Sequence, residues 1–421
     1  MGSFSAEVSI RPARAEDVNT IHRIIVSAFS LAEGSERWGY MQKMAQGWQN
    51  FLVMEKKGEP VGVTRVGRDR LRFGESAVVL KGEVGYVGVL PELHGQGLGT
   101  ALMEGTVRFM RENGFHISRL GGLNRFYARF GYVPFPRRYY EFSLDPIGAG
   151  AKTMTPDVFL GPSSEERVRL RPYEPGRDWM ARCRLYDLFN GGRTGSMVES
   201  RPPSPQSGGL DQTGLRWIYD DGNSVRAYAF ANMTGTSVEI YDFAGDFSHP
   251  QALAAVVKRV LWEAVRKGAK QALGRLPFDN RVEQALVDGV VPYVLREIQS
   301  APASNMIRVV NLPLLLEAVS PEWTRRLAAA GGVGWTGVLE FQVQDQTGKV
   351  ELTSRGATPA EAGASPDARL TFGPRGFLLA ALGHRDFCEV AHQICGDLSP
   401  SLENTLRILF RREPCASGPL G

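Results

Sequence analysis

Cysteine is scarce in this chain of 421 residues, and the few cysteines lie far apart. The four positions are Cys183, Cys388, Cys395 and Cys415. No two of them form a CxxC pair, so the pattern argues against a disulfide-stabilised scaffold. We expect a protein of the reducing cytoplasm.

Charge of one sign and long apolar runs are also missing. Forty-nine Lys and Arg face 45 Asp and Glu, and the net charge of +4 is too small to indicate a nucleic-acid partner. No apolar run approaches the roughly 18 residues of a membrane span. The first ten residues lack the basic region and apolar core of a signal peptide, and Ala6 stands where myristoylation requires Ser or Thr. We therefore expect neither nucleic-acid nor membrane partners.

The chain contains a faint internal repeat. Residues 8–12 (VSIRP) are echoed by residues 168–172 (VRLRP), and each segment leads from a strand-like to a helix-like pattern. Asp17 and Asp178 follow at matching places, as expected of a helix cap or first-turn acid.

The echo continues further along the chain. Residues 83–89 read as a strand followed by a loop and a helix, and residues 239–244 read as a strand followed by a helix over 251–267. We predict α/β and α+β architecture, with mixed sheets flanked by helices. The predicted domains are 1–148, a related copy at 149–305, and an α+β unit at 306–421. Residues 148–164 are predicted to form a linker, residues 194–214 a long mobile loop, and residues 354–367 a hairpin tip or a surface loop.

A glycine-rich segment carries most of the functional information. Gly95, Gly97 and Gly99 alternate just before a predicted helix that ends near Asn113, with Gly114 as its stop. Such a turn presents free backbone N–H groups to an anion, helped by the helix dipole. A tight turn without a ligand is the alternative. The segment fits neither a dinucleotide-binding fingerprint nor a Walker loop.

Two motifs resemble the GNAT-type N-acetyltransferases. Residues 91–102 (PELHGQGLGTAL) are similar to the loop with which that superfamily binds the acetyl-CoA pyrophosphate, although His94 stands where Arg or Gln is usual. Residues 124–132 (NRFYARFGY) resemble its late helix. The resemblance implies acetyl-CoA as co-substrate; no metal is expected. The residues implied to bind it are Val87, Gly88, Val89, Gly95, Gln96, Gly97, Leu98, Gly99, Thr100 and Gly122.

The resemblance also implies catalytic roles. Backbone N–H groups around Gly88 would polarise the thioester carbonyl, and Tyr127 matches the tyrosine that protonates the departing thiolate. Core packing is the alternative for Tyr127. The amine acceptor must lose a proton before attack, so Glu33, Glu36 and Glu83 are candidate bases, each with a solvated or structural alternative.

The three-domain organisation resembles the Eis-type acetyltransferases (enhanced intracellular survival). That resemblance implies a third domain similar to sterol carrier proteins and a homo-hexamer. It also implies a terminal carboxylate acting as base, here that of Gly421, although the family usually ends on an aromatic residue. A frayed terminus is the alternative. The second copy has Ser248, His249 and Pro250 in place of the glycine loop, so we expect it not to bind CoA.

The acceptor and one further cluster stay open. Aromatic residues after the first helix, Phe29, Trp38, Tyr40 and Trp48, could cage a cationic amine or pack in the core. The predicted acceptor is an aminoglycoside, a polyamine-like molecule or a lysine. A non-catalytic scaffold that senses CoA or lipid is the alternative.

His384, Cys388, His392 and Cys395 fall on one stripe of a predicted helix. Eleven helical residues rise about 16 Å, so the four cannot share a metal ion, and we expect a buried or interfacial stripe.

Overall fold

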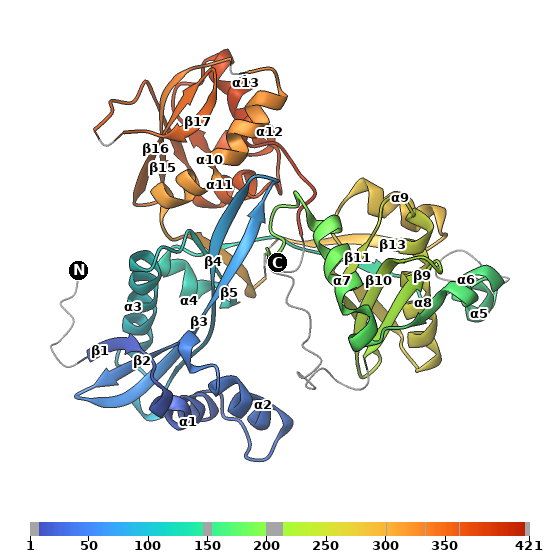
Figure 1. The fold of residues 1–421 in the computed structure, drawn as a ribbon. Coiled ribbons are helices and arrows are strands. Elements are labelled where there is room, and N and C mark those ends of the chain that lie inside the picture. The colour runs from blue at the N-terminus through green and yellow to red at the C-terminus, as the bar shows by residue number, and fades with distance from the viewer. Residues whose placement is uncertain are drawn as a thin grey trace.

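Three sheet-based units make up the fold. The computed structural model describes residues 8–145, 154–198, 214–299, 301–332, 334–361 and 363–416. Within these residues each unit contains one sheet, and the units meet near the centre of the molecule (Figure 1). The mixed sheets with their covering helices confirm the predicted fold class.

The first sheet is mixed and has the order β1-β2-β3-β4-β5-β14-β6. Its strands are β1 (Val8–Pro12), β2 (Phe51–Lys56), β3 (Glu59–Phe73), β4 (Ala77–Val89), β5 (Ile117–Leu123), β6 (Val133–Pro134) and β14 (Ala303–Val309). The long β3–β4 hairpin is antiparallel, whereas β4 pairs with β5 in parallel. A parallel neighbour requires a crossover, and the helix between β4 and β5 supplies it.

Helices cover both faces of the outer part of this sheet. They are α1 (Val18–Ala28), α2 (Glu36–Ala45), α3 (Leu98–Glu112) and α4 (Asn124–Tyr127). Strand alternation explains the two layers: Phe51 and Val53 of β2 pack with α1, whereas Met54 packs with α3. The predicted helix end is confirmed, because Gly114 follows α3 with a φ of +74°.

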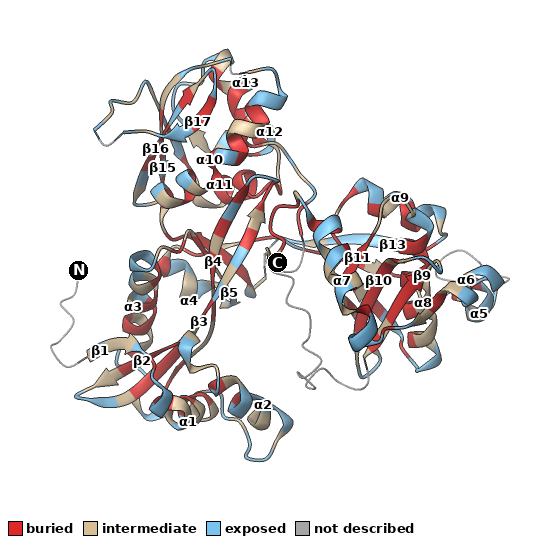
Figure 2. Cartoon of the chain, in the orientation of Figure 1, coloured by how far each residue is buried: buried red, intermediate tan, exposed pale blue. Residues whose placement is uncertain are grey.

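The second sheet has the order β13-β7-β12-β11-β10-β9-β8. Its strands are β7 (Arg137–Phe142), β8 (Leu170–Pro172), β9 (Leu215–Asp220), β10 (Val225–Thr234), β11 (Ser237–Gly245), β12 (Gln271–Gly274) and β13 (Tyr293–Ile298). Its helices are α5 (Pro156–Leu160), α6 (Ser164–Arg169), α7 (Pro175–Asn190), α8 (Pro250–Arg266) and α9 (Asn280–Asp288). Helix α8 is buried along most of its length against β9 to β11 (Figure 2).

An ion-pair motif confirms the internal repeat. Arg11 in β1 binds the Asp17 carboxylate, with Nη1 2.7 Å from Oδ2, and Arg171 in β8 binds Asp178 in the same way at the same distance. Each aspartate also accepts a backbone N–H from the turn before its helix. Each aspartate therefore ties the strand to the helix that follows through an arginine, in addition to its expected place as a cap or first-turn acid of that helix.

The third unit contains a smaller sheet of order β17-β16-β15-β18-β19. Its strands are β15 (Gly337–Val343), β16 (Gln346–Thr353), β17 (Gly356–Pro359), β18 (Ala368–Phe372) and β19 (Ile394–Cys395), and its helices are α10 (Leu312–Ala329), α11 (Pro374–Ala381), α12 (Phe387–Val390) and α13 (Pro400–Leu409). Its core is continuous with the tip of the β3–β4 hairpin, because Phe73 and Trp323 belong to one buried cluster.

Strand exchange departs from the predicted boundaries in two places. Strand β7, at 137–142, pairs with β12 and β13 of the second sheet. Strand β14, at 303–309, pairs with β5 and β6 of the first. Cuts at 148/149 and 305/306 would each leave a strand or part of one with the wrong sheet. Strand pairing depends on long-range register, which local patterns do not encode.

The predicted loops also differ in part. Residues 156–160 of the expected linker are helical, and its last residue, Ser164, begins α6. Residues 356–359 form β17, which pairs antiparallel with β16, so the start of the third segment is a hairpin tip, one of its two predicted forms. Residues 194–198 pair with the end of β3, as in the bond from Arg72 N to Ser196 O. Within the described residues, no helix has both the length and the apolarity needed to cross a bilayer.

Candidate active site

The central feature of the first unit is a separation of two parallel strands. Strands β4 and β5 pair from Lys81↔Ile117 as far as Val84↔Leu120, and no pairing continues beyond that point. Both strands nevertheless extend further, β4 to Val89 and β5 to Leu123. A wedge therefore opens between their carboxyl ends, where ligands of α/β sheets bind.

A bulge in β4 stands at the start of this wedge. The β3–β4 register shifts between Val63 and Arg65, and Tyr86 adopts a φ of +51°, which is uncommon for a residue with a side chain. Beyond the bulge, Leu90 donates its N–H to Val61 O. Since successive residues of a strand point to opposite edges, the N–H of Val89 points away from β3 and toward the wedge.

The glycine loop lies beyond the end of β4 and opens α3. Gly95 and Gly97 have φ values of +79° and +77°, so both need the left-handed conformation that glycine adopts without strain. Gly97 is the N-cap of α3 and no side chain caps the helix, and the first backbone bond of the helix is from Ala101 N to Gly97 O. The N–H groups of 98–100 are therefore available to an anion.

Two residues fasten the loop to the sheet. His94 Nε2 lies 3.0 Å from Val89 O, and Lys56 Nζ at the end of β2 donates to Gln96 Oε1 at 2.7 Å. His94 thus has a local structural role, which explains why the residue can differ from the usual Arg or Gln. Lys56 adds a cation beside the loop.

The late helix brings Tyr127 to the wedge. A Cβ on Gly122 at the end of β5 would clash with the Tyr127 ring, so this glycine makes room for the tyrosine. Tyr127 packs edge-to-face on Phe126, whose ring in turn approaches Gly99. Burial raises the pKa of the Tyr127 phenol above its ordinary value. The phenol is therefore neutral at pH 7 and able to donate a proton.

Gly88 has a packing role besides the predicted one. A Cβ at Gly88 would lie 2.9 Å from the Cβ of Ala28 at the end of α1. The helix approaches the strand too closely there for any side chain. Val87 and Val89 point to the opposite face, where they pack with α3.

A charged surface lies on the face of the sheet that looks toward the second unit. Lys81 is 2% exposed, and its Nζ lies 2.8 Å from Glu83 Oε2 and 3.2 Å from Asp69 Oδ2. Arg119 on β5 pairs with Glu83 and donates to Asn305 on β14. These side chains hold the strands together just before they separate.

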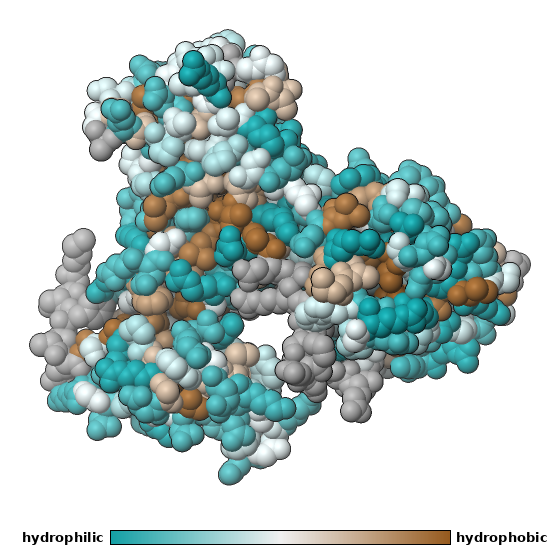
Figure 3. All heavy atoms as spheres, in the orientation of Figure 1, coloured by the Kyte–Doolittle hydropathy of each residue, from teal (hydrophilic) through white to brown (hydrophobic). Residues whose placement is uncertain are grey.

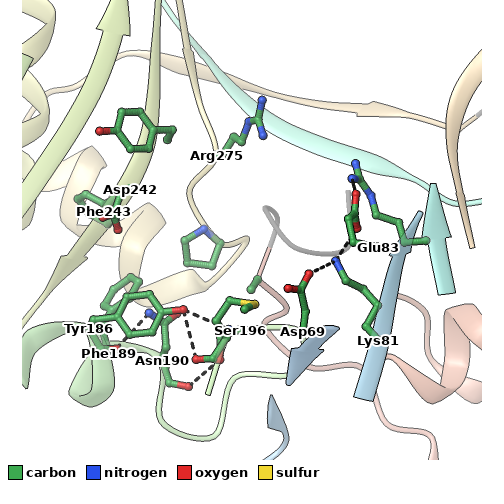
Figure 4. A pocket seen from close by; sticks show the side chains of 15 residues that line it. Asp69, Lys81, Glu83, Tyr186, Phe189, Asn190, Ser196, Asp242, Phe243 and Arg275 are labelled. Carbon is green, nitrogen blue, oxygen red and sulfur yellow. Dashed lines mark hydrogen bonds and ion pairs between the residues drawn. The ribbon is translucent and has the colours of Figure 1, made fainter. Parts of the chain in front are cut away.

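A cavity of about 370 Å³ lies between this surface and the second unit, and we call it the cleft cavity. Its lining combines Asp69, Lys81, Glu83 and Arg119 with Tyr186, Phe189, Asn190, Ser196, Met197, Tyr241, Asp242, Phe243, Arg275, Pro277 and Ala416. Figure 4 shows the charged group of the first unit on one side and the aromatic residues of α7 and β11 on the other. The cleft cavity therefore adjoins the wedge, because two of its lining residues, Glu83 and Arg119, directly precede the last paired residues of β4 and β5.

The candidate bases have separate surroundings. Glu83 is shared between Lys81 and Arg119, which favours a structural role. Glu33 and Glu36 are exposed, before and at the start of α2, and neither lines the cleft cavity. Gly421 lies outside the described residues. Ala416, the last described residue, lines the cleft cavity and donates its N–H to Thr194 O.

The structure separates the four candidate aromatic residues. Phe29 and Tyr40 are 39% and 51% exposed, and Phe29 packs edge-to-face on Tyr86. Burial, and then the neighbouring Tyr40, raises the pKa of Tyr86 to about 12. Trp38 packs on His22 instead, and Trp48 joins the apolar cluster beneath α1. An aromatic edge thus borders the bulge, and sequence reasoning missed Tyr86 within it.

The His–Cys stripe is not a helix. His384 follows α11, Cys388 is in α12, His392 is in a single turn, and Cys395 is in β19. Only His384 is buried and the other three are exposed, so these residues do not form a buried stripe, and the interfacial alternative stays a prediction. Among the described residues, no three His, Cys, Asp or Glu side chains come close enough together to hold a metal.

Sequence reasoning also missed Lys56, Lys81 and Arg119. Lys56 could have been found only by knowing that β2 ends beside the glycine loop. Lys81 and Glu83 alternate with other residues of their strand, but such a pattern is typical of any half-exposed sheet.

Residues 9–135 match the family model of the acetyltransferase (GNAT) domain. This part of the chain is therefore a GNAT acetyltransferase domain, and the predicted resemblance is confirmed for it. The match covers the strand separation, the glycine loop and the late helix described above. No curated protein matches the sequence significantly.

Several solved structures share the fold over nearly the whole chain. A GCN5-related N-acetyltransferase from Kribbella flavida superposes with a TM-score of 0.66 at 16% identity, covering 97% of each chain. One from Anabaena variabilis gives a TM-score of 0.68 at 15% identity, covering 97% of this chain and 98% of the other. Eis1 from Mycobacterium abscessus gives a TM-score of 0.61 at 16% identity, covering 97% of this chain and 98% of the other. These similarities show that the three-unit fold is a recurrent one.

Proposed function

We propose that the protein is an acetyl-CoA-dependent N-acetyltransferase that acetylates a primary amine on a small molecule or a lysine by direct transfer. The observation that carries the proposal is the wedge between β4 and β5. It is flanked by the uncapped start of α3 on one side and by Tyr127 on the other.

The residues present fit the co-substrate. The N–H groups of Leu98, Gly99 and Thr100 would bind the diphosphate, with Gly95 and Gly97 allowing close approach of the backbone and Gln96 held by Lys56. The wedge would take the extended pantetheine arm, with Val87, Gly88 and Val89 along one edge and Gly122 on the other. When bound, acetyl-CoA supplies the activated acetyl group.

The chain would supply a polarising donor and an acid. The N–H of Val89 points into the wedge, where it can hydrogen-bond the thioester carbonyl. The Tyr127 phenol can give its proton to the sulfur of the departing thiolate. Both groups are positioned before the substrate arrives, because the bulge and Gly122 fix them.

The acceptor would enter from the cleft cavity. Gly85 stands two residues after Glu83 on the same face of β4, and a Cβ there would meet nothing within 4 Å. The terminal carboxylate of Gly421 is our first candidate for the base. The position of Ala416, which lines the cleft cavity five positions before Gly421, supports this choice.

Thiol release from acetyl-CoA with a panel of amines tests the proposal. Aminoglycosides, polyamines and a lysine peptide should each be tried against a reaction without amine. At least one amine should accelerate release well above that background. Acetyl-CoA binding without release by any amine would instead support the non-catalytic scaffold.

A paired variant tests where the acceptor enters. Gly85→Leu should raise the KM for the best amine and leave acetyl-CoA affinity unchanged, because the added side chain would project into the cleft. Gly176→Leu on α7 is the matched control, since a Cβ there also meets nothing within 4 Å. Equal KM values in both variants would place the acceptor elsewhere.

Several finer features stay predictions. They are the similarity of the third unit to sterol carrier proteins, the division into a catalytic and a degenerate unit, the hexamer and the cytoplasmic location. The acceptor class within the panel also stays open.

A further inference from the structure

A second cavity lies where the three units meet, and we call it the junction cavity. It has a volume of about 410 Å³ and is lined by Glu75, Gly191, Gly192, Arg193, Arg281, Arg325, Arg411, Arg412, Glu413 and Pro414. The lining comes from the β3–β4 hairpin tip, the end of α7, the start of α9, α10 and the C-terminal segment. On the face that Figure 3 draws, hydrophilic residues cover most of the surface, so a cavity lined by charged residues is not unusual in itself.

The charge of this cavity is unusual. Five arginines line it against two carboxylates. Two further carboxylates lie beside the cavity and pair with its arginines. Asp279 binds both Arg193 and Arg281, and Glu322 binds Arg325. Arg412 is exposed and makes no ion pair with the described residues. Positive charge therefore exceeds negative charge around the cavity.

Arg193 is the buried member of the group. It is 4% exposed, and its Nη2 donates to Asp279 Oδ2 at 2.8 Å. Its Nε and Nη1 are buried without a hydrogen-bond partner among the described residues. Burial lowers the pKa of this guanidinium despite the Asp279 carboxylate, as expected of a cation with too few acceptors. Buried polar groups are normally satisfied, so two free donors on one guanidinium need an explanation.

From the buried, under-satisfied Arg193 and the surplus of arginines around the junction cavity, we infer a binding site for a small polyanion that carries phosphate or carboxylate groups. Planar guanidinium groups bind both kinds of oxyanion through two parallel hydrogen bonds. The volume is large enough for more than one such group. The proposal does not depend on the proposed acetyltransferase function.

The junction cavity is distinct from the glycine loop. Glu75 lies at the tip of the β3–β4 hairpin, whereas the glycine loop follows the other end of β4. The 13 residues of β4 span about 40 Å. An anion in the junction cavity would instead contact the segment 411–414, which Cys415 alone separates from Ala416 at the wall of the cleft cavity.

Calorimetry on the full chain tests the site with two probes, pyrophosphate for phosphate and citrate for carboxylate. The variant R281Q/R412Q removes two accessible charges and leaves Arg193 paired with Asp279. Arg355→Gln is the matched control, because Arg355 is an exposed arginine outside the junction cavity. We expect saturable binding of at least one probe, weakened tenfold or more in R281Q/R412Q, unchanged in Arg355→Gln, and weaker at higher salt.

The glycine loop is the competing site for pyrophosphate. Pyrophosphate binding should persist in Gly97→Asp, which repels anions from that loop. Binding lost in Gly97→Asp but unchanged in R281Q/R412Q would overturn the proposal, as would the absence of saturable binding of either probe. Thermal unfolding of every variant shows whether it is folded before it is titrated.

Discussion

The first and second units share a plan but differ at the start of one helix. In the second sheet, β11 pairs with β12 in parallel from Ser237↔Gln271 to Ile240↔Gly274, and a register shift follows at once. In the first sheet, β4 and β5 also form four parallel pairs, and the bulge of β4 follows. A register shift after four parallel residue pairs is therefore common to both units, but β12 ends at its last paired residue, Gly274, whereas β5 continues to Leu123.

The helix that follows is different. In the first unit, α3 begins at Gly97 with its N–H groups uncapped. In the second unit, α8 begins with Pro250, and the Asp246 carboxylate accepts hydrogen bonds from Ser248 N and Oγ. The proline removes one N–H donor from the first turn of α8, whereas the first three residues of α3 all carry one. The two units therefore differ in the residues at the start of this helix, and this difference is the reason we propose that only the first unit binds CoA.

The largest expected effect is on acetyl-CoA binding. Gly97→Asp should abolish binding measured by calorimetry, because it places a carboxylate beside the diphosphate. Asparagine and aspartate tolerate the left-handed conformation comparatively well, so the protein should stay folded. Gly97→Asn is the matched neutral control and should bind more tightly than Gly97→Asp.

Wild-type protein should bind one acetyl-CoA per chain, and Asp246→Asn should leave that stoichiometry unchanged. A stoichiometry of two would break the comparison between the units.

The second effect concerns the acid. Tyr127→Phe keeps the ring and removes the hydroxyl, so turnover should fall by about 10²–10⁴-fold while acetyl-CoA affinity barely changes. Tyr173→Phe in the second unit is the control, since the Tyr173 hydroxyl is buried without a partner among the described residues. Full activity in Tyr127→Phe would remove the assigned role.

The third effect concerns the tail at the cleft between the two units. Deletion of residues 417–421 should lower turnover by about 10²-fold or more if the terminal carboxylate is the base. The unfolding temperature should not change, because Cys415 and Ala416, which anchor the segment, remain. A fully active truncation would move the base to Glu33 or Glu36.

The smallest effect concerns the repeated ion pair. Asp17→Asn and Asp178→Asn should each destabilise the protein by about 2 kcal/mol, because each breaks charge-assisted hydrogen bonds of a buried carboxylate. The two variants should lower the thermal unfolding midpoint by similar amounts. Very different values would show that the two turns are not energetically equivalent.

The same pairs predict a pH dependence. The Arg11 guanidinium lowers the pKa of Asp17. Burial opposes the shift at Asp178, but hydrogen bonds from Arg171 and the Glu174 N–H still lower its pKa. Folded pKa values below the unfolded ones mean that this stability is present at neutral pH and lost in acid, below about pH 4. Each Asn variant should therefore unfold closer to wild type in acid than at pH 7.

Local patterns predicted much of the fold. The strand-to-helix segments, the stop at Gly114 and the repeat were all visible, because they depend on periodicity, glycine conformation and short sequence echoes. The continuous helix through His384 and Cys395 was wrong, because a pattern of spacing does not show where tertiary packing interrupts a helix.

The candidate site divides in the same way. The glycine loop and the Tyr127 motif are contiguous in sequence, and their chemistry depends on residue type and local conformation. The cleft cavity, the aromatic edge with Tyr86 and the junction cavity each combine segments more than 100 residues apart or depend on a register shift.

The sequence by itself thus determined the GNAT-like first unit, the glycine-rich turn that opens its helix α3 and the different residues at the start of α8 in the second unit. Only the tertiary structure decided that β7 and β14 change sheets, that Glu83 is held by Lys81 and Arg119, and that the C-terminal segment reaches the cleft. The physical reason is range: backbone conformation and helix ends follow from neighbouring residues, whereas strand pairing and buried charges depend on contacts that exist only once the chain has folded.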